Sequence, residues 1–311
     1  LPSYGSGKNF GNQLALKQCK IFVNALRKPT SYSSSITKKE LDRQTSRKFV
    51  STNHLPALQA GYKFLGGNRL KIGSRVYQYW NSREIEGRVK TLTIKRTTLG
   101  ELFMIVVVDN IVELEVKSET SRIAGFDFGL KVFLTVSDGT QIESPQFLKQ
   151  SLTVIKKASR QHSKKVKGST NRERARKNLV RRHEDVVNRR SDWLWKLAHD
   201  LTDRFDVLCF ETLNLKGMQR LWGRKISDLA FGEFLQILEW VAKKKDKQIV
   251  FIDRWYPSSE TCSNCGHVLK ELDLSIREWR CPSCQSVNGR DQNAAKNICV
   301  VGASTARVRR C

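Results

Sequence analysis

Three acidic residues that lie far apart in the chain each stand at the edge of a regular segment. Asp127 is embedded in an apolar strand pattern, Glu211 ends a short apolar run, and Asp291 opens a helical pattern. An ionised carboxylate in apolar surroundings is costly unless a cation lies beside it. A single such residue is more often a turn or cap residue, but three at the edges of separate segments indicate a fold-assembled site for a hard cation. Oxygen ligands favour Mg²⁺ or Mn²⁺ over zinc.

Four cysteines form a second candidate metal site. Cys262 and Cys265 make one Cys-x-x-Cys pair, and Cys281 and Cys284 make another after fifteen intervening residues. This spacing is typical of four thiolates that hold zinc tetrahedrally. Because four protein ligands leave no open position for water, the expected zinc is structural.

The charge balance of the chain points to a polyanionic partner. The 311 residues include 56 Lys and Arg against 30 Asp and Glu, which gives a formal net charge of +26, and 39% are hydrophobic. A folded protein with this excess is expected to face nucleic acid. The alternatives are a basic solvated surface such as ribosomal proteins carry, or an acidic membrane, which the lack of an amphipathic anchor disfavours.

The positive charge is densest between Lys149 and Arg190, where fifteen Lys or Arg accompany three Asp or Glu. Gly168 interrupts this stretch, so we expect a helical hairpin that packs one side on the core and shows the other to phosphate. The nucleic-acid contacts expected here are Lys156, Lys157, Lys164, Lys165, Arg174, Arg181, Arg182 and Arg189.

Membrane and export signals are weak. The longest apolar run, residues 102–108, falls well short of the roughly 18 to 20 residues of a membrane span. The first ten residues lack the apolar segment of a secretory signal. We therefore expect no membrane partner and an intracellular, cytoplasmic and nucleoid-associated protein. The first residue is Leu1 and not Met, so we expect the native start to lie upstream.

Four sequence motifs together resemble the RuvC-like nucleases of the TnpB family, the transposon-encoded relatives of type V CRISPR effectors. The motifs are Gly125-Phe-Asp-Phe-Gly-Leu-Lys131, Phe210-Glu-Thr-Leu-Asn-Leu-Lys-Gly217, Tyr256-Pro-Ser-Ser-Glu-Thr-Cys-Ser-Asn-Cys-Gly266 and Arg290-Asp-Gln-Asn-Ala-Ala-Lys-Asn-Ile298. The resemblance extends from about residue 80 to residue 300. It implies a guide RNA and target double-stranded DNA as partners.

The resemblance also implies roles for the three acidic residues. Asp127, Glu211 and Asp291 would be catalytic ligands of two Mg²⁺ ions about 4 Å apart, one activating water and the other stabilising the departing 3′-oxygen. The residues before the third carboxylate, Asn288-Gly289-Arg290, depart from the expected Asp-Arg form. Arg290 is kept, and a contact of Arg290 with DNA or with the carboxylates is expected.

The expected fold class is a mixed α+β protein with an RNase H-like (RuvC) core, an inserted helical hairpin and a zinc ribbon. A short helical recognition lobe and a small β-barrel, the wedge, would precede the core. The expected domains are a recognition-lobe remnant over 1–61, the wedge over 62–120, the core over 121–256, the zinc ribbon over 257–289, and a C-terminal helix and tail over 290–311.

Local patterns support this division. Apolar residues at Leu14, Ile21 and Leu26 share a helical face, and Thr37-Lys-Lys-Glu40 fits a capping box. Since the resemblance implies a larger lobe, either this lobe is reduced or segments are absent from the chain. Residues 62–119 have a period of two, which is typical of antiparallel strands. The aromatic residues of this region either stack bases or fill the barrel core: Tyr77, Tyr79 and Trp80.

Within the core, the strand pattern at 206–213, the helical pattern at 227–245 and the strand pattern at 248–252 predict a parallel βαβ unit. Asp138 lies in the turn 137–140 and is interpreted as structural. Two asparagines follow the third carboxylate, and they either hydrogen-bond the carboxylates or pack the helix end: Asn293 and Asn297.

Taken together, we expect an RNA-guided, Mg²⁺-dependent DNA endonuclease. RNA guidance follows from the resemblance, since charge indicates only a polyanion. One alternative is a nuclease-inactive RNA-guided repressor, which the presence of all three carboxylates disfavours. Another is a RuvC-type resolvase or transposase that works without RNA, which the ribbon before the third carboxylate disfavours. No heptad pattern decides the oligomeric state.

Overall fold

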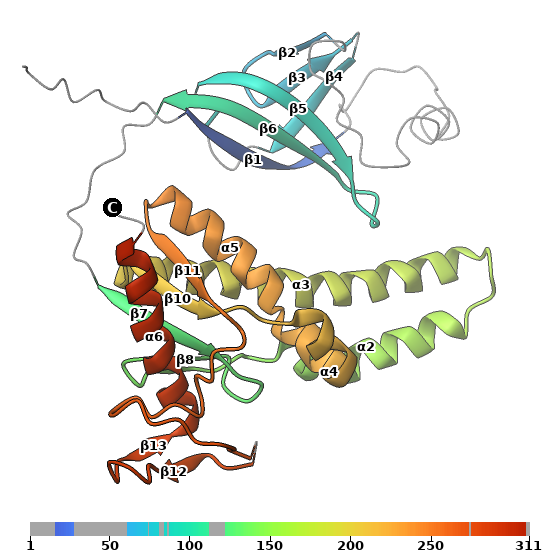
Figure 1. Cartoon of the computed structure of the whole chain (residues 1–311). Coiled ribbons are helices and arrows are strands. Elements are labelled where there is room, and N and C mark those ends of the chain that lie inside the picture. The colour runs from blue at the N-terminus through green and yellow to red at the C-terminus, as the bar shows by residue number, and fades with distance from the viewer. Residues whose placement is uncertain are drawn as a thin grey trace, which may run out of the picture. The chain divides into compact units, whose positions relative to one another are not determined.

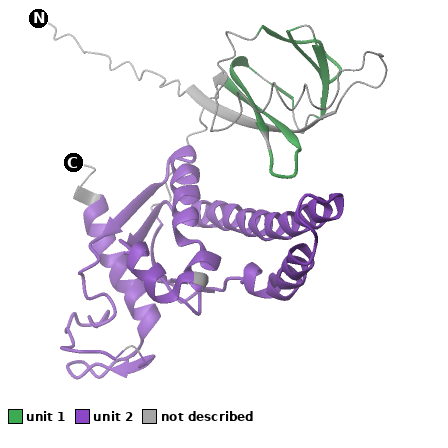
Figure 2. Ribbon diagram, turned by 90° about the vertical axis from the view of Figure 1, so that its right-hand side faces the viewer, with its two compact units in different colours: residues 1–117 green, residues 118–311 purple. Residues whose placement is uncertain are grey.

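The computed structural model describes residues 16–27, residues 61–111 except 74, 81–83 and 86, and residues 122–308 except 274. The chain divides into two compact units, residues 1–117 and 118–311 (Figure 2). Within the described part, no helix has the length and apolar content that a membrane span requires.

The first unit is built on a six-stranded antiparallel sheet with the order β2-β3-β4-β1-β6-β5. Its strands are β1 (Leu16–Arg27), β2 (Tyr62–Phe64), β3 (Arg69–Ile72), β4 (Arg75–Trp80), β5 (Arg88–Arg96) and β6 (Leu102–Ile111). The period of two therefore predicted these strands correctly from residue 62 onward. Closure of the sheet into a barrel stays a prediction.

The prediction of a helix over the first apolar stretch is wrong, because residues 16–27 form β1, which pairs with both β4 and β6. The sequence also carries a period of two, with Cys19, Ile21 and Val23 alternating with polar or larger residues. β-branched side chains favour the strand, and two long partner strands supply the hydrogen bonds that a helix would make internally. The capping box at Thr37 to Glu40 lies outside the described residues.

The aromatic residues of the first unit have different roles. Tyr79 is buried in the core with Leu70 and Met104, and its ring makes an edge-to-face contact with Phe64 at 6.1 Å. Trp80, the next residue, is 71% exposed because consecutive side chains of a strand point to opposite faces. The core interpretation thus holds for Tyr79 and not for Trp80.

The second unit contains a five-stranded mixed sheet with the order β11-β10-β7-β8-β9. Its strands are β7 (Ile123–Phe128), β8 (Leu134–Val136), β9 (Gln141–Ile142), β10 (Val207–Glu211) and β11 (Gln248–Ile252). β7, β10 and β11 are parallel, and β8 and β9 run antiparallel beside them. The predicted parallel βαβ unit between β10 and β11 is confirmed.

Two layers of helices cover this sheet. On one face, Phe126 and Phe210 stack at 4.9 Å between ring centroids and pack under α3 (Thr170–Arg204) and α5 (Phe231–Lys244). The other face carries Cys209 and Val250 and packs against α6 (Arg290–Val308). Figure 1 shows α6 in red along β7 and β10.

The predicted helical hairpin is confirmed as α2 (Phe147–Ser163) and α3, joined by residues 164–169 and projecting from the sheet in Figure 1. The N-terminus of α2 is capped from another element: the buried Asp228 accepts hydrogen bonds from the amides of Leu148 and Lys149, at 3.0 and 3.2 Å. Asp228 ends α4 (Leu215–Leu229), a helix that the sequence patterns did not predict. The carboxylate satisfies free amides and complements the helix dipole, so it fixes the root of the hairpin.

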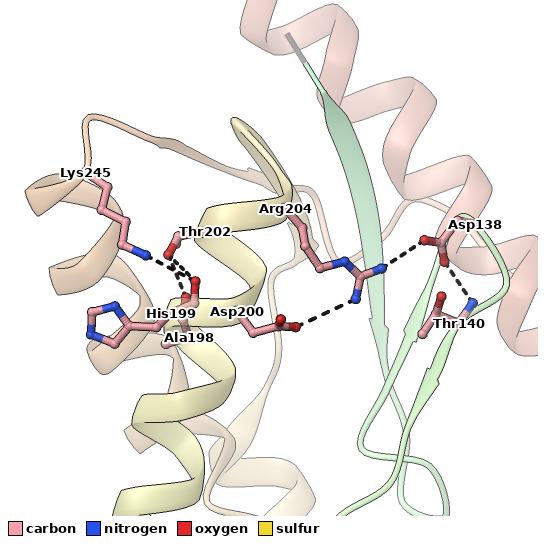
Figure 3. A network of polar contacts seen from close by, with 8 residues as sticks. All are labelled: Asp138, Thr140, Ala198, His199, Asp200, Thr202, Arg204 and Lys245. Carbon is pink, nitrogen blue, oxygen red and sulfur yellow. Dashed lines mark hydrogen bonds and ion pairs between the residues drawn. The ribbon is translucent and has the colours of Figure 1, made fainter. Parts of the chain in front are cut away.

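A polar network fixes the C-terminal end of α3 (Figure 3). Arg204 contacts Asp138 at 3.3 Å and Asp200 at 3.7 Å. Asp138 in turn accepts a hydrogen bond from the amide of Thr140 at 2.8 Å, as in an Asx turn. The structural role predicted for Asp138 agrees with this position.

Gly125 lets α6 lie directly on the sheet. A Cβ atom at this position would stand 2.1 Å from the carbonyl oxygen of Ala295 and 2.4 Å from the amide nitrogen of Cys299. The strand and helix backbones therefore meet without an intervening side chain. Further along α6, a Cβ atom at Gly302 would stand 2.4 Å from the Sγ atom of Cys209 in β10, so here the helix packs on a side chain of the strand.

We predict that Gly125→Ala lowers the free energy of unfolding by about 1 to 3 kcal/mol, because α6 must move away from β7. Chemical denaturation of the purified variant measures this difference. Gly223→Ala is the matched control: its Cβ would enter open space in α4, and alanine favours a helix by up to about 1 kcal/mol. Equal stability of Gly125→Ala and the unmodified protein would contradict the close packing.

Candidate active site

Asp127 and Glu211 lie side by side at the carboxyl ends of two parallel strands. Phe126 of β7 is opposite Phe210 of β10, so the next residue on each strand is a carboxylate. Neighbouring strands are about 4.8 Å apart, and side chains one residue beyond the stacked phenylalanines point to the opposite face of the sheet. Both carboxylates thus face the side that α6 covers.

Asp291 reaches the same place from α6. Ala295, whose carbonyl lies over Gly125, is one helical turn after Asp291, and Asp127 is two residues after Gly125 on the same face. The negative charges of Asp291 and Glu211 both act on the carboxyl of Asp127. The structure therefore brings together the three acidic residues that the sequence singled out.

The assembled carboxylates disfavour one another's ionisation. Burial raises the pKa of Asp127 from its ordinary 3.8 to about 8, and the charges of Asp291 and Glu211 add to this rise while Arg290 opposes it. Burial also raises the pKa of Glu211, although the Ser258 hydroxyl, 3.5 Å from its Oε2 atom, stabilises the charged form. A divalent cation beside these three oxygen donors would compensate their charge and hold all three ionised.

Two arginines flank this group. The Nη1 atom of Arg277 lies 3.4 Å from Oδ1 of Asp291. The backbone carbonyl of Arg277 accepts a hydrogen bond from the amide of Arg290 at 2.7 Å. Arg290 is half-buried and donates from its own Nη1 to the carbonyl of Asp273 at 2.7 Å. The sequence analysis missed Arg277. Its only signal is indirect: pairing of the strands that flank the second cysteine pair would place it opposite Arg290.

The two asparagines of α6 hydrogen-bond the first residues of the predicted ribbon, and not the carboxylates. The side-chain amide of Asn293 donates to the Thr261 carbonyl at 2.7 Å, and its oxygen accepts from the Ser263 amide at 2.8 Å. Asn297 donates to the carbonyls of Ser258 and Thr261 at 2.8 and 2.6 Å. These buried bonds tie the zinc ribbon to the helix that carries Asp291.

The four cysteines of the predicted ribbon form one cluster, with all Sγ atoms within 4.8 Å of one another. The Sγ atoms of Cys262 and Cys284 are 3.7 Å apart, and those of Cys265 and Cys281 are 3.6 Å apart. Four sulfurs at the usual Zn–S distance of about 2.3 Å in a tetrahedron are separated by roughly 3.8 Å, so the cluster fits zinc.

The surroundings of Cys284 also favour its thiolate. The Ser286 hydroxyl lies 3.1 Å from Sγ of Cys284 and lowers the pKa of that thiol to about 5. β12 (Glu278–Arg280) pairs with β13 (Val287–Gly289), and β13 runs directly into α6. Only Arg290 therefore separates the ribbon from Asp291.

The eight basic residues of the hairpin that are predicted to contact nucleic acid are all exposed, on α2, on α3 and, for Lys164 and Lys165, in the connection between them. Between the two helices lies a groove of about 320 Å³, whose basic members are Lys157 and Arg182. α2 contains no acidic residue. Arg190, in contrast, has a structural role: it lies 3.4 Å from Glu233 and donates to the Ser227 carbonyl.

Two protein families match stretches of this chain. Residues 105–221 match the OrfB_IS605 family, described as "Probable transposase", and residues 231–298 match the family described as "Cas12f1-like, TNB domain". A Streptomyces pristinaespiralis protein, provisionally named an RNA-guided DNA endonuclease, is 34% identical over 218 residues, which are 70% of this chain and 54% of that protein. The TnpB-like protein L79 of Acanthamoeba polyphaga mimivirus is 32% identical over 194 residues, 57% of this chain and 37% of that protein.

A solved CRISPR-Cas12f ternary complex aligns with 96% of this chain and 62% of its own, at 14% identity and a TM-score of 0.46. The comparison relies on the sequence matches. They cover both carboxylate-bearing strands, the ribbon and the start of α6. Over these stretches the chain is similar to TnpB-like proteins.

The pKa of Asp127 predicts how stability depends on pH without added Mg²⁺. The folded state keeps a proton up to about pH 8, whereas the unfolded chain releases it near pH 4, so the free energy of unfolding falls as pH rises between these values. Asp127→Asn carries no titrating group and escapes this loss. The variant should therefore gain thermal stability relative to the unmodified protein from about pH 5 to about pH 8.5, as followed by circular dichroism. A constant difference between the two proteins would contradict the raised pKa.

We predict that Cys281→Ser lowers zinc content and the yield of folded protein together, because the remaining three thiols cannot complete the tetrahedral site. Elemental analysis of purified protein measures the zinc. Cys299→Ser, which changes a half-buried thiol of α6 outside the cluster, is the control and should retain zinc. Soluble, fully folded Cys281→Ser protein without zinc would show that the ribbon folds without metal.

Proposed function

We propose that the protein is an RNA-guided endonuclease that hydrolyses phosphodiester bonds of target DNA. The observation that carries this proposal is the gathering of Asp127, Glu211 and Asp291. They lie at the carboxyl ends of β7 and β10, on the sheet face that α6 covers. Supporting it are the family matches of the chain and the provisional name of its Streptomyces relative. The chain spans 54% of that relative, so the activity of the whole protein is part of the proposal.

The three carboxylates would bind two divalent cations, Mg²⁺ or Mn²⁺, and when bound these supply activation of water and stabilisation of the departing 3′-oxygen. The mixed sheet with helices on both faces is consistent with the RNase H-like fold inferred from the motifs. Hydrolysis adds water to phosphorus and breaks the bond to the 3′-oxygen, which leaves a 5′-phosphate and a 3′-hydroxyl.

The remaining polar groups of the site would position the DNA. Arg277 pairs with Asp291 at 3.4 Å while more than half of its side chain stays exposed, so its guanidinium can also reach a phosphate at the site. Arg290 lies beside the carboxylates and lowers the pKa of Asp127. Neither arginine can serve as a proton acceptor, so their role is to hold negative charge.

The exposed basic residues of α2 and α3 would bind the nucleic-acid backbone. Since α2 has no acidic residue, its cations Lys156, Lys157 and Arg160 have no carboxylate on their own helix to neutralise them. Phosphate contacts of this kind are independent of sequence and weaken with salt. Reading of the target sequence would fall to base pairing with a guide RNA, as in guided nucleases generally. The zinc ribbon would fix the position of Asp291.

The test is to purify the protein from cells that express its native locus, sequence the RNA it protects, and assay cleavage of a matching duplex with and without Mg²⁺. We expect a discrete RNA and cutting that requires both. Asp127→Ala should lower the cutting rate at least about a hundredfold and leave RNA-dependent DNA binding intact, because it removes a cation ligand and no phosphate contact.

Asp138→Ala is the matched control, since this exposed aspartate holds a turn and Arg204, and it should cut normally. Parallel loss of binding in Asp127→Ala would contradict its assignment as a cation ligand. A discrete RNA with DNA binding but no cutting in the unmodified protein would point to a repressor. Absence of RNA would point to a resolvase or transposase that acts alone.

A further inference from the structure

Trp255 is 82% exposed, the largest exposed fraction among the large apolar side chains of the described residues. An indole buries 150 to 250 Å² when it packs, so leaving one in water forgoes a substantial stabilisation. The next residue, Tyr256, is the one that packs against the core cluster around Val250 and Ile252. Packing in the core therefore does not account for Trp255.

Both ends of the loop that carries Trp255 lie beside Glu211. Ile252 is opposite Glu211 in the pairing of β10 with β11, and Ser258 places its hydroxyl 3.5 Å from the Glu211 carboxylate. Trp255 is three residues from each of these anchors. Because an extended residue spans at most about 3.6 Å, its Cα lies within about 11 Å of both.

Hydrogen bonds hold this loop in one conformation. Asp253 accepts from the Trp255 amide through Oδ1 at 3.0 Å and from the Tyr256 amide through its carbonyl at 3.2 Å. The Ser258 amide donates to the Tyr256 carbonyl at 2.7 Å, and the Ser258 carbonyl is bound by Asn297. The exposed indole therefore projects from an ordered turn. Binding a ligand then loses little further backbone entropy in this loop.

The charge beside the ring selects the kind of ligand. The guanidinium carbon of the exposed Arg254 lies 5.9 Å from the centroid of the Trp255 ring. An aromatic face next to a guanidinium suits an unstacked nucleobase and its neighbouring phosphate. A base within a duplex offers no free face, because its neighbours cover both sides.

We propose that Trp255 and Arg254 form a stacking subsite for an unpaired nucleobase of the strand that is presented to Asp127, Glu211 and Asp291. The inference rests on the proposed function and adds that Trp255 holds one base of this strand on one side of the bond to be cut. Trp255 is a positioning residue: it binds the base and leaves the reacting phosphorus to other groups.

The first measurement uses the Asp127→Ala protein, which leaves DNA intact, and a single-stranded DNA oligonucleotide that contains 5-iodouracil. Irradiation joins a stacked iodouracil to the aromatic ring, and mass spectrometry of the digested protein locates the bond. We expect a crosslinked peptide that contains Trp255. With Trp255→Ala in the same background, its yield should fall about tenfold, as loss of one stacking contact implies, and Trp255→Phe should restore most of it.

Trp240→Ala is the matched control, because Trp240 is also an exposed tryptophan, 47% accessible, but lies on α5, which covers the sheet face opposite α6. It should leave the crosslink unchanged. Crosslinking at other peptides only, or a yield that does not change in Trp255→Ala, would overturn the subsite. Since Trp255 is exposed, its replacement should not alter the melting temperature, which checks that the variant is folded.

The second measurement is cleavage by otherwise unmodified protein of a duplex with an unpaired bubble. Trp255→Ala should cut the bubble about tenfold more slowly, with a raised KM, and Trp240→Ala at the normal rate. If the unmodified protein cuts DNA and Trp255→Ala cuts it equally well, the subsite fails and the proposed function stands. If nothing is cut but the crosslink depends on Trp255, the proposed endonuclease activity fails and the subsite stands.

Discussion

The direct contact of two backbones at Gly125 is the constraint on which the site depends. A side chain on this residue would meet the carbonyl of Ala295 at 2.1 Å, so only glycine lets α6 rest on β7 at this depth. One turn before Ala295, the helix delivers Asp291, and two residues after Gly125 the strand delivers Asp127. Pairing of β7 with β10 adds Glu211. Close packing and strand register thus decide where three remote carboxylates meet.

Without a cation, the burial and mutual repulsion of the three carboxylates are electrostatically costly. Neighbouring groups partly offset this cost. Arg277 and Arg290 bring positive charge to the edge of the site, and the Ser258 hydroxyl supports Glu211. Asn293 and Asn297 attach the loop at Ser258 and the cysteine cluster to the same helix. A like-charge cluster that persists in a fold is more typical of a binding site than of a structural element, because an apolar core would be more stable.

The sequence pointed to candidate site residues more directly than to the fold around them. Acidic residues in apolar segments stand out because they violate local patterning, and the four cysteines do so through their spacing. The stretch at residues 16–27 has both a helical face and a period of two, and its partners β4 and β6 lie far along the chain, so only tertiary pairing decides for the strand. α4, Arg277 and the loop bonds of Asn293 also depend on contacts across many residues, which no local pattern records.

The central claim is that Asp127, Glu211 and Asp291 form one binding site for divalent cations. The most direct measurement counts Mn²⁺ ions bound to the purified protein by electron paramagnetic resonance, comparing the unmodified protein with Asp127→Asn and with Asp138→Asn. The account predicts two Mn²⁺ ions whose spins are coupled, loss of the coupled signal in Asp127→Asn, and no change in Asp138→Asn. Binding of Mn²⁺ that is the same in all three proteins would contradict it.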